Sequence, residues 1–517
     1  MKKILKYYFL LVFSIILTNC TNDLNTQPEA ELSLEELLDR DPQAIEGILS
    51  RLYASFALSG PDGPESSDIP DDAGESPFLR GIVNLQDFTA DGMKNRWGDD
   101  GLDQLTTTSN WTSENKFFRY LYNRIYYTIP QANNLIQILN AVDVDNEDVI
   151  LSEVRFIRSL AYYYLIDAFG KGVLATEENL GNTTALPEVN RQELFNYVES
   201  ELLAIEPTLL DLNEYGRATK VAAQMLLSKL YLNAEVYTGT AKWNEAATYV
   251  NKVINSGASL ATNYIMLFSG DNDSNGARSE IIFPLIADAA TSQSYGNTTY
   301  IVNGSLSSET LSPNDFGATQ GWAGHRASKG WYRLFGNSET ELQNSTDVRA
   351  SLFWTQGHNF EMNDYREWTD GYPSTKFRNS NFSGASTSSD FSNTDFPLFR
   401  LADAYLMYAE LALRGAANTD VSTGLGYLNQ VRNRSGASPF NSYSEDDVID
   451  ERGRELNLEG HRRSDLIRFG RFTGSTYIWP WKGGTAQGSS IPDTYSLFPI
   501  PTAALQSNRN LTQNPGY

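Results

Sequence analysis

The chain has 517 residues and a formal net charge of −24, with 64 acidic residues against 40 Lys and Arg. A chain of that length exceeds what one hydrophobic core usually supports, so at least two lobes or a superhelix of helices is expected. So strong a negative charge repels phosphate backbones and anionic lipid surfaces, which argues against nucleic acid as a partner.

The first nineteen residues have the pattern of an export signal. Lys2, Lys3 and Lys6 form a basic start, and residues 7–17 form an apolar run that is too short to span a bilayer comfortably. Cys20, the only cysteine, follows at once. Because a lone thiol in an exported protein has no partner in its own chain, this position favours lipid attachment over a free thiol. Loss of the three signal lysines would take the net charge from −24 to −27.

After Cys20 the sequence predicts a polar tether over residues 20–31 and an amphipathic helix over residues 34–56. Residues 61–77 are rich in Gly, Pro, Ser and Asp and too long for a simple connection, and long loops of this kind are often functional. Residues 78–111 carry Arg80, Trp97 and Trp111 among Gly, Asp, Asn and Thr, and we expect this stretch to be exposed.

Residues 217–254 carry the clearest helical pattern. Apolar residues recur at three- and four-residue spacing on both sides of Gly239, which predicts two antiparallel helices, and Trp243 opens the second much as in tetratricopeptide units. Such a pair needs neighbours to bury its apolar face, and further helical runs occur at residues 117–139, 152–169, 398–413 and 425–431. The sequence therefore predicts a mainly α fold, in which tetratricopeptide-like helix pairs form a superhelical scaffold within a single unit over residues 32–517. Loop-rich insertions interrupt it at about 60–111 and 264–395.

The second insertion contains a strand-like run at residues 281–283, and helix is expected to restart at residues 395–400 and to end at Gly415. A charged helix is expected over residues 448–469, where Arg alternates with Glu and Asp at helical spacing. This spacing favours structural ion pairs along a helix over an anion-binding site. Residues 498–517 are expected to be irregular and to pack across the surface.

Residues 271–276 begin like an EF-hand calcium loop. Asp271, Asp273 and Asn275 place oxygen atoms at alternate positions, and Gly276 would allow the tight turn. The bidentate acid is missing, because Ile282 stands at the twelfth position. A structural calcium ion and a simple acid-rich turn both remain open.

Markers of catalysis are absent or unspecific. The three histidines lie far apart, and the sequence has no HExxH, GxSxG or P-loop motif. Two suitably separated carboxylates would suffice for a glycosidase, but none of the 64 acids is singled out. We therefore predict that the protein is not an enzyme.

Several segments resemble the SusD/RagB family of glycan-binding lipoproteins of the Bacteroidetes outer membrane. They are Cys20 with its signal and residues 153–164, 217–255, 395–405, 451–469 and 498–501, in the family's order. Residues 232–239, 479–484 and 513–517 further resemble the starch-binding founding member. The resemblance implies a shallow sugar site on inserted loops, a lipid anchor on the exterior face of the outer membrane, and a SusC-like TonB-dependent transporter as partner.

The resemblance also implies which residues would contact a glycan. Trp97, Tyr295 and Trp322 stand in segments similar to those that carry the aromatic arc of the starch-binding relative, with Arg80 nearby. Asp100 stands where an amide is expected, and an acid can accept a hydrogen bond from a sugar hydroxyl but cannot donate one.

The resemblance therefore implies a site for starch-like α-glucan chains on these rings. A β-glucan or another polysaccharide is the alternative within the family, and a helical adaptor for peptides or proteins is the alternative outside it. Each ring has an alternative role as a loop anchor buried against the scaffold. That role is our interpretation of four other tryptophans, Trp111, Trp331, Trp354 and Trp368.

Overall fold

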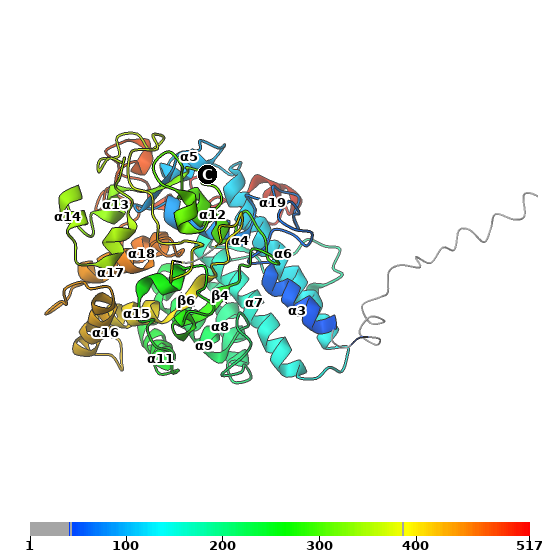
Figure 1. Cartoon of the computed structure of the whole chain (residues 1–517). Coiled ribbons are helices and arrows are strands. Elements are labelled where there is room, and N and C mark those ends of the chain that lie inside the picture. The colour runs from blue at the N-terminus through cyan, green and yellow to red at the C-terminus, as the bar shows by residue number, and fades with distance from the viewer. Residues whose placement is uncertain (1–40, 42–43, 385–386) are drawn as a thin grey trace, which may run out of the picture. The chain divides into compact units, whose positions relative to one another are not determined.

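The computed structural model describes residue 41 and residues 44–384 and 387–517. The predicted signal, Cys20 and the tether lie outside the described residues. The chain divides into two units, Met1–Ile48 and Leu49–Tyr517. Of the helix predicted over residues 34–56, the structure describes α3, Ala44–Ala54, which begins in the first unit. The second unit holds the rest of the described chain (Figure 1).

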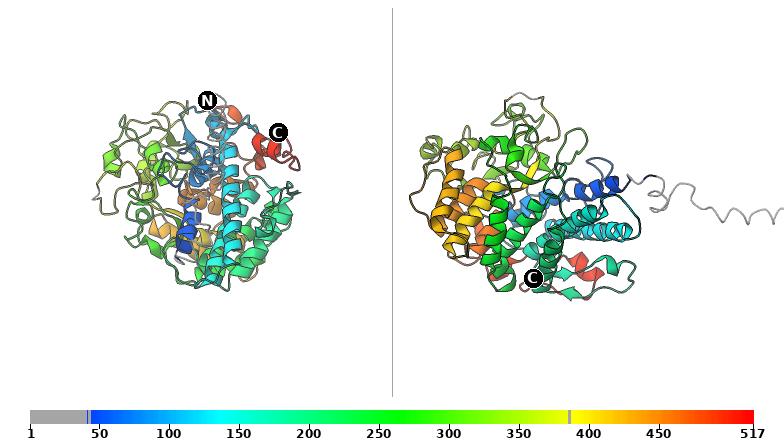
Figure 2. Two further views of the ribbon diagram at one scale, coloured as in Figure 1. Left: turned by 90° about the vertical axis from the view of Figure 1, so that its right-hand side faces the viewer. Right: turned by 90° about the horizontal axis from the view of Figure 1, so that it is seen from below.

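Long helices that pack on one another in succession form the scaffold of the second unit. They are α6 (Lys116–Leu139), α7 (Glu147–Ala168), α8 (Arg191–Ile205), α9 (Lys220–Leu232), α11 (Trp243–Ile254), α15 (Leu401–Leu413) and α16 (Val421–Arg434). In the right-hand view of Figure 2 they follow one another from cyan through green to yellow and orange. Each helix buries its apolar side against its neighbours, as in stacked helix pairs. The predicted mainly α scaffold is confirmed.

The central pair, α9 and α11, comes from the segment with the clearest periodicity. The Thr219 side chain caps α9 by accepting a hydrogen bond from the backbone N–H of Ala222 at 3.2 Å. The short helix α10 (Ala234–Thr238) stops at Gly239, whose φ of 76° lies in the left-handed region. Trp243 then begins α11, as predicted.

Within the described residues, six short strands make three antiparallel pairs. They are β1 (Met93–Asn95) with β5 (His325–Ala327), β2 (Gly172–Val173) with β3 (Glu188–Val189), and β4 (Ile281–Leu285) with β6 (Phe396–Arg400). Strand β4 confirms the strand predicted at residues 281–283. The prediction of helix from residue 395 is wrong, because β6 precedes α15. Every residue of β6 is buried, so it shows no alternation that would distinguish a strand.

The two insertions fold around short helices. The first contains α4 (Phe78–Val83), a π-helix (Asn84–Phe88) and α5 (Leu102–Thr106), and the second contains α12 (Thr298–Gly304), α13 (Lys329–Tyr332) and α14 (Glu339–Gln343). Helices α5, α12, α13 and α14 lie in the upper part of Figure 1, and α8, α9 and α11 lie in the lower part. The C-terminal segment adds α19 (Thr502–Ser507). Among the described helices, none has both the length and the apolar character needed to cross a bilayer.

The expectation that residues 78–111 are exposed is wrong for their first part, because all of α4 and the π-helix is buried. Their polar side chains are buried with partners. The Tyr300 hydroxyl donates to Asn84 Oδ1 at 2.6 Å, and the Gln86 amide donates to Asp167 at 2.7 Å. The structural interpretation of Trp111, Trp331 and Trp368 agrees with their exposed fractions of 4%, 3% and 0%.

The prediction of a single charged helix over residues 448–469 is wrong. The structure has two helices there, α17 (Glu445–Leu456) and α18 (Arg462–Arg468). Leu458 and Gly460 between them have φ values of 64° and 75°, which a continuous α-helix does not allow.

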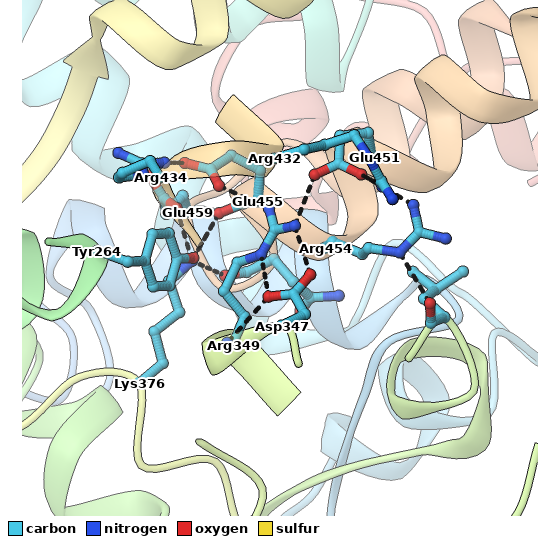
Figure 3. Close-up of polar contacts among 12 residues, drawn as sticks. Tyr264, Asp347, Arg349, Lys376, Arg432, Arg434, Glu451, Arg454, Glu455 and Glu459 are labelled. Carbon is cyan, nitrogen blue, oxygen red and sulfur yellow. Dashed lines mark hydrogen bonds and ion pairs between the residues drawn. The ribbon is translucent and has the colours of Figure 1, made fainter. Parts of the chain in front are cut away.

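The charges of this segment form a buried network around Glu455 (Figure 3). Glu455 pairs with Arg349 at 2.8 Å, with Arg400 at 2.6 Å and with Arg434. None of these side chains is more than 4% exposed. The predicted structural ion pairs are therefore present. Most of them do not run along one helix but join α17, through the interior, to β6, to α16 and to the segment around residue 349.

Candidate functional site

Three of the predicted site residues form a continuous row of aromatic rings. The ring centroids of Trp97 and Trp322 lie 6.5 Å apart, and those of Trp322 and Tyr295 lie 6.3 Å apart. Neighbouring ring planes are tilted by 54° in both pairs, so the ring faces turn along the row. All three side chains are partly exposed. Residues more than 200 positions apart thus meet at one place.

Trp97 is held in one orientation by the segment that follows Trp322. Its indole N–H donates to the Trp322 carbonyl oxygen at 2.8 Å. A Cβ atom at position 324 would lie 2.4 Å from the Trp97 ring, so only glycine lets the indole pack against this backbone. The pairing of β1 with β5, which sets Asn95 opposite His325, brings the two segments together.

Trp322 projects from a turn with unusual backbone geometry. Its N–H donates to the Asn303 carbonyl at 2.7 Å, and the next N–H, of Ala323, donates to the Leu306 carbonyl at 2.8 Å. Ala323 has a φ of 51°, a left-handed conformation that costs a residue with a Cβ atom roughly 1–3 kcal/mol. Such outliers persist only where the surrounding structure holds them in place, and they are frequent at ligand sites.

A buried layer supports the row from below. Arg80, predicted as a ligand contact, is only 6% exposed. Its guanidinium lies over Tyr300 at 4.3 Å and near Trp97 at 5.8 Å, and its Nη1 donates to the Gly74 carbonyl at 3.0 Å. The structure therefore places Arg80 under the rings, where it can support Trp97.

His325 belongs to the same layer, with its ring 5.3 Å from Trp97 and 4.5 Å from Tyr300. Burial, and then the charge of Arg80, lower the pKa of His325 well below its usual value. The imidazole is therefore neutral at physiological pH. The charge of the His325 ring beside Trp97 therefore does not change near neutral pH.

The row continues to Phe391, which the sequence did not single out. Its ring lies 5.1 Å from Tyr295, and it is partly exposed. Phe391 stands in a Ser- and Asp-rich stretch without periodicity, so its only available signal was an apolar ring among polar residues. The structure thus extends the predicted row by one ring.

Polar side chains lie beside Trp97 and beside Tyr295. At the Trp97 end, Asp100 is exposed, and Arg96 donates to the Ala323 carbonyl at 2.7 Å and pairs with the exposed Glu309 at 3.2 Å. Beside Tyr295, burial and then the charge of the nearby Glu65 carboxylate raise the pKa of the Tyr295 hydroxyl. Flat rings flanked by carboxylates and an arginine suit a ligand with apolar faces and hydroxylated edges.

The calcium-loop pattern folds as an acid-rich turn. Asp271 Oδ1 accepts hydrogen bonds from the Phe382 backbone N–H at 2.8 Å and from the Asn275 amide at 3.1 Å. Asn275 Oδ1 accepts one from Ala277 N–H at 3.0 Å, and Asp273 accepts one from the Ser274 hydroxyl at 2.9 Å. Within the described residues, no group of three His, Cys, Asp or Glu side chains is arranged to hold a metal ion. The oxygens proposed as calcium ligands hold the turn together.

Comparisons with known proteins identify the family of this chain. A profile of the SusD family matches residues 279–517, and a second profile, described as starch-binding associating with outer membrane, matches residues 83–232. The starch-binding protein SusD of Bacteroides thetaiotaomicron is 31% identical, and the alignment covers 100% of this chain and 99% of that protein. The chain belongs to the SusD family.

Two solved structures share its fold. A laminarin-binding SusD-like protein has a TM-score of 0.67 at 21% identity, covering 92% of this chain and 99% of that one. A structure with a xylogluco-oligosaccharide has a TM-score of 0.68 at 20% identity, covering 90% and 97%. SusD-family proteins bind carbohydrates and are not catalysts, so this chain is a glycan-binding protein of a family associated with the outer membrane.

Proposed function

We propose that this SusD-family protein binds starch-like α-glucan chains, such as malto-oligosaccharides, on the row formed by Trp97, Trp322, Tyr295 and Phe391. The observation that carries the proposal is the continuity of partly exposed rings, whose neighbouring planes are tilted by 54°, 54° and 44° along the row. A helical α-glucan presents its sugar faces along a curve, and a turning row of rings can follow that curve. Full-length similarity to a starch-binding protein supports the same substrate class.

The expected affinity is weak. Ring contacts contribute roughly 0.5–1.5 kcal/mol each beyond the burial of area, and an open site loses much of this to ordering the ligand. A dissociation constant on the order of 0.01–1 mM, or about −4 to −7 kcal/mol, follows. Weak binding suits a protein that passes its ligand on without breaking a bond, and many anchored copies at one surface compensate by avidity.

Affinity electrophoresis in amylopectin gels tests the site. Trp97→Ala and Trp322→Ala should each reduce the retardation of the protein, because each removes one ring of the row. Trp243→Ala is a matched control, since Trp243 is a partly exposed tryptophan on α11 whose ring lies under the Arg414 guanidinium and is not part of the row. Unchanged retardation of both row variants would reject this assignment.

A β-glucan is the second candidate, because the structural neighbours include a laminarin-binding protein and a structure with a xylogluco-oligosaccharide. A panel of amylopectin, laminarin, xyloglucan and xylan separates the candidates. Stronger retardation by laminarin than by amylopectin would replace the α-glucan by a β-glucan. No retardation by any polysaccharide would favour the peptide-binding adaptor.

We further propose that Cys20 carries a lipid anchor facing the cell exterior and that the bound glycan passes to a TonB-dependent transporter. The position of Cys20 after an export signal and the outer-membrane description of the matched profile support this. Cys20→Ala should release the protein from the membrane fraction. Co-purification of the wild-type protein with an outer-membrane transporter in detergent tests the partnership, and purification without one would contradict it.

A further inference from the structure

The structure contains a hollow that is separate from the aromatic row. It has a volume of about 420 Å³ and runs between the loop that precedes α9, the acid-rich turn and the segments around residues 287 and 394. Its side chains include Tyr215, Asp273, Arg278, Asp288, Asn393 and Asp395. None of the four rings of the row lines it. Small-molecule sites fall in the range of about 300–1,000 Å³, so the hollow is large enough for a compact ligand.

One wall combines an aromatic ring with a planar cation. The Arg278 guanidinium lies over the Tyr215 ring at 3.9 Å from its centroid, which orients the guanidinium. Arg278 and Asp273, 3.9 Å apart, are about half exposed, at 49% and 50%. A stacked guanidinium beside a carboxylate offers several donors and an acceptor at fixed positions.

The floor holds an enclosed hydroxyl, that of Tyr215, next to a buried carboxyl, that of Asp395. The Tyr215 hydroxyl is enclosed, and among the described residues it has no partner with standard hydrogen-bond geometry. Asp395 beside it is 2% exposed, and its Oδ1 accepts from the Ala287 N–H at 2.9 Å. Burial raises the pKa of Asp395 to about 7, so near neutral pH this carboxyl can accept or donate. Enclosed polar atoms of this kind are costly unless a ligand or water pairs with them.

The charges around the hollow select the ligand class. Three carboxyl groups face one guanidinium, which disfavours phosphates, sulfates and sugar acids. Asn393 Oδ1 accepts from Ala289 N–H at 2.9 Å, so its amide nitrogen is the atom it can offer to a ligand. Donors and acceptors in this mixture, without a large apolar wall, match a compact molecule with many hydroxyl groups.

We propose that this hollow, lined by Tyr215, Arg278, Asp273, Asn393 and Asp395, is a second carbohydrate site that takes one or two neutral sugar residues. This second site does not require that the aromatic row binds a glycan. The segment that carries Phe391 to the row carries Asn393 to the hollow two residues later, so one stretch of chain borders both.

Saturation-transfer NMR with maltotriose, laminaritriose and xylotriose tests the proposal on the full-length protein. The double variant Trp97→Ala/Trp322→Ala should retain saturation transfer to at least one trisaccharide. Adding Arg278→Ala should weaken that binding about tenfold, because charged hydrogen bonds are lost. Since the Arg278 side chain is half exposed, the fold should tolerate the change, and circular dichroism checks it. Arg471→Ala, which removes an arginine paired with the exposed Asp446, is the matched control.

Loss of all saturation transfer in the double variant, or an Arg278→Ala result equal to the Arg471→Ala result, would overturn the second site. The amylopectin gel keeps this test separate from the test of the row. Arg278→Ala alone leaves the row intact, so it should reduce retardation in amylopectin less than the double variant Trp97→Ala/Trp322→Ala does. If the wild-type protein is not retarded but trisaccharide binding depends on Arg278, the row proposal fails and the second site stands.

Discussion

The aromatic row and the buried charge network are assembled in the same way but bear on stability very differently. Each brings together residues from segments more than 100 positions apart, such as Trp97 with Trp322 and Arg349 with Glu455. The rings are partly exposed and touch a buried layer on one side, whereas the charges of the network have almost no contact with solvent. The comparison teaches that this fold depends on its buried charges, while its exposed rings are free to serve a ligand.

Energetics explains the difference. Burial alone would raise the pKa of Glu455, but the charges of Arg434, Arg400 and Arg349 outweigh this and lower it strongly. Each of these groups would be costly to bury without its partners. A ring of the row, by contrast, leaves no unpaired charge behind when it is removed.

The largest effect is expected from Glu455→Ala. It leaves three buried arginines without their common carboxylate and should lower the free energy of unfolding by about 3–5 kcal/mol, measured by urea denaturation. The control is Asp211→Ala in the pair with Lys220, where the Asp211 side chain is 82% exposed and the loss should stay below about 1 kcal/mol. Equal losses in the two variants would remove the distinction between network and surface.

The second-largest effect is expected at acid pH, which should lower the stability of the folded protein. Burial alone would raise the pKa of Asp465, but Arg452 and Arg468 outweigh it and lower the pKa from 3.8 to about 2. Because the folded pKa is lower, this stabilisation is present above about pH 4 and is lost as the pH falls towards about 2, by about 2 kcal/mol.

Melting temperatures measured across that range should therefore fall for the wild-type protein. Asp465→Asn should start from a lower melting temperature at neutral pH and show a shallower acid slope. An identical slope in both proteins would contradict the role of Asp465.

Trp322→Ala should separate binding from stability. It should weaken binding of soluble amylopectin about tenfold, equivalent to about 1.4 kcal/mol, because the ring between Trp97 and Tyr295 is lost. The loss of unfolding free energy should be about 1 kcal/mol, since the ring is partly exposed. Isothermal titration and urea denaturation give the two values. Trp243→Ala, whose ring packs beneath Arg414, should lose stability without losing affinity.

The smallest effect is expected from Tyr295→Phe, which keeps the ring and removes only the hydroxyl beside Glu65. If the ring face carries the contact, affinity should change by less than about twofold, well below the effect of Trp322→Ala. Tyr295→Ala is the comparison in the same titration. A large loss from the Phe variant would show that the hydroxyl edge is the recognised group.

Much of the scaffold follows from local sequence. The periodicity on both sides of Gly239 placed two helices, and Trp243 marked the start of the second, because helix formation depends on neighbours within a few residues. Strand β6 and the break between α17 and α18 did not follow. Full burial removes the alternation of a strand, and an Arg- and Glu-rich segment has helical spacing whether it faces solvent or the interior.

The candidate site was likewise predicted only in part from the sequence. Trp97, Tyr295 and Trp322 could be singled out from the sequence by family resemblance, as flat rings in polar loops. Only tertiary structure decided that the rings touch, that Phe391 extends the row, and that Arg80 lies beneath it. The physical reason is that contacts between distant segments depend on how strands and turns are paired across the fold, and no local pattern of residues encodes that pairing.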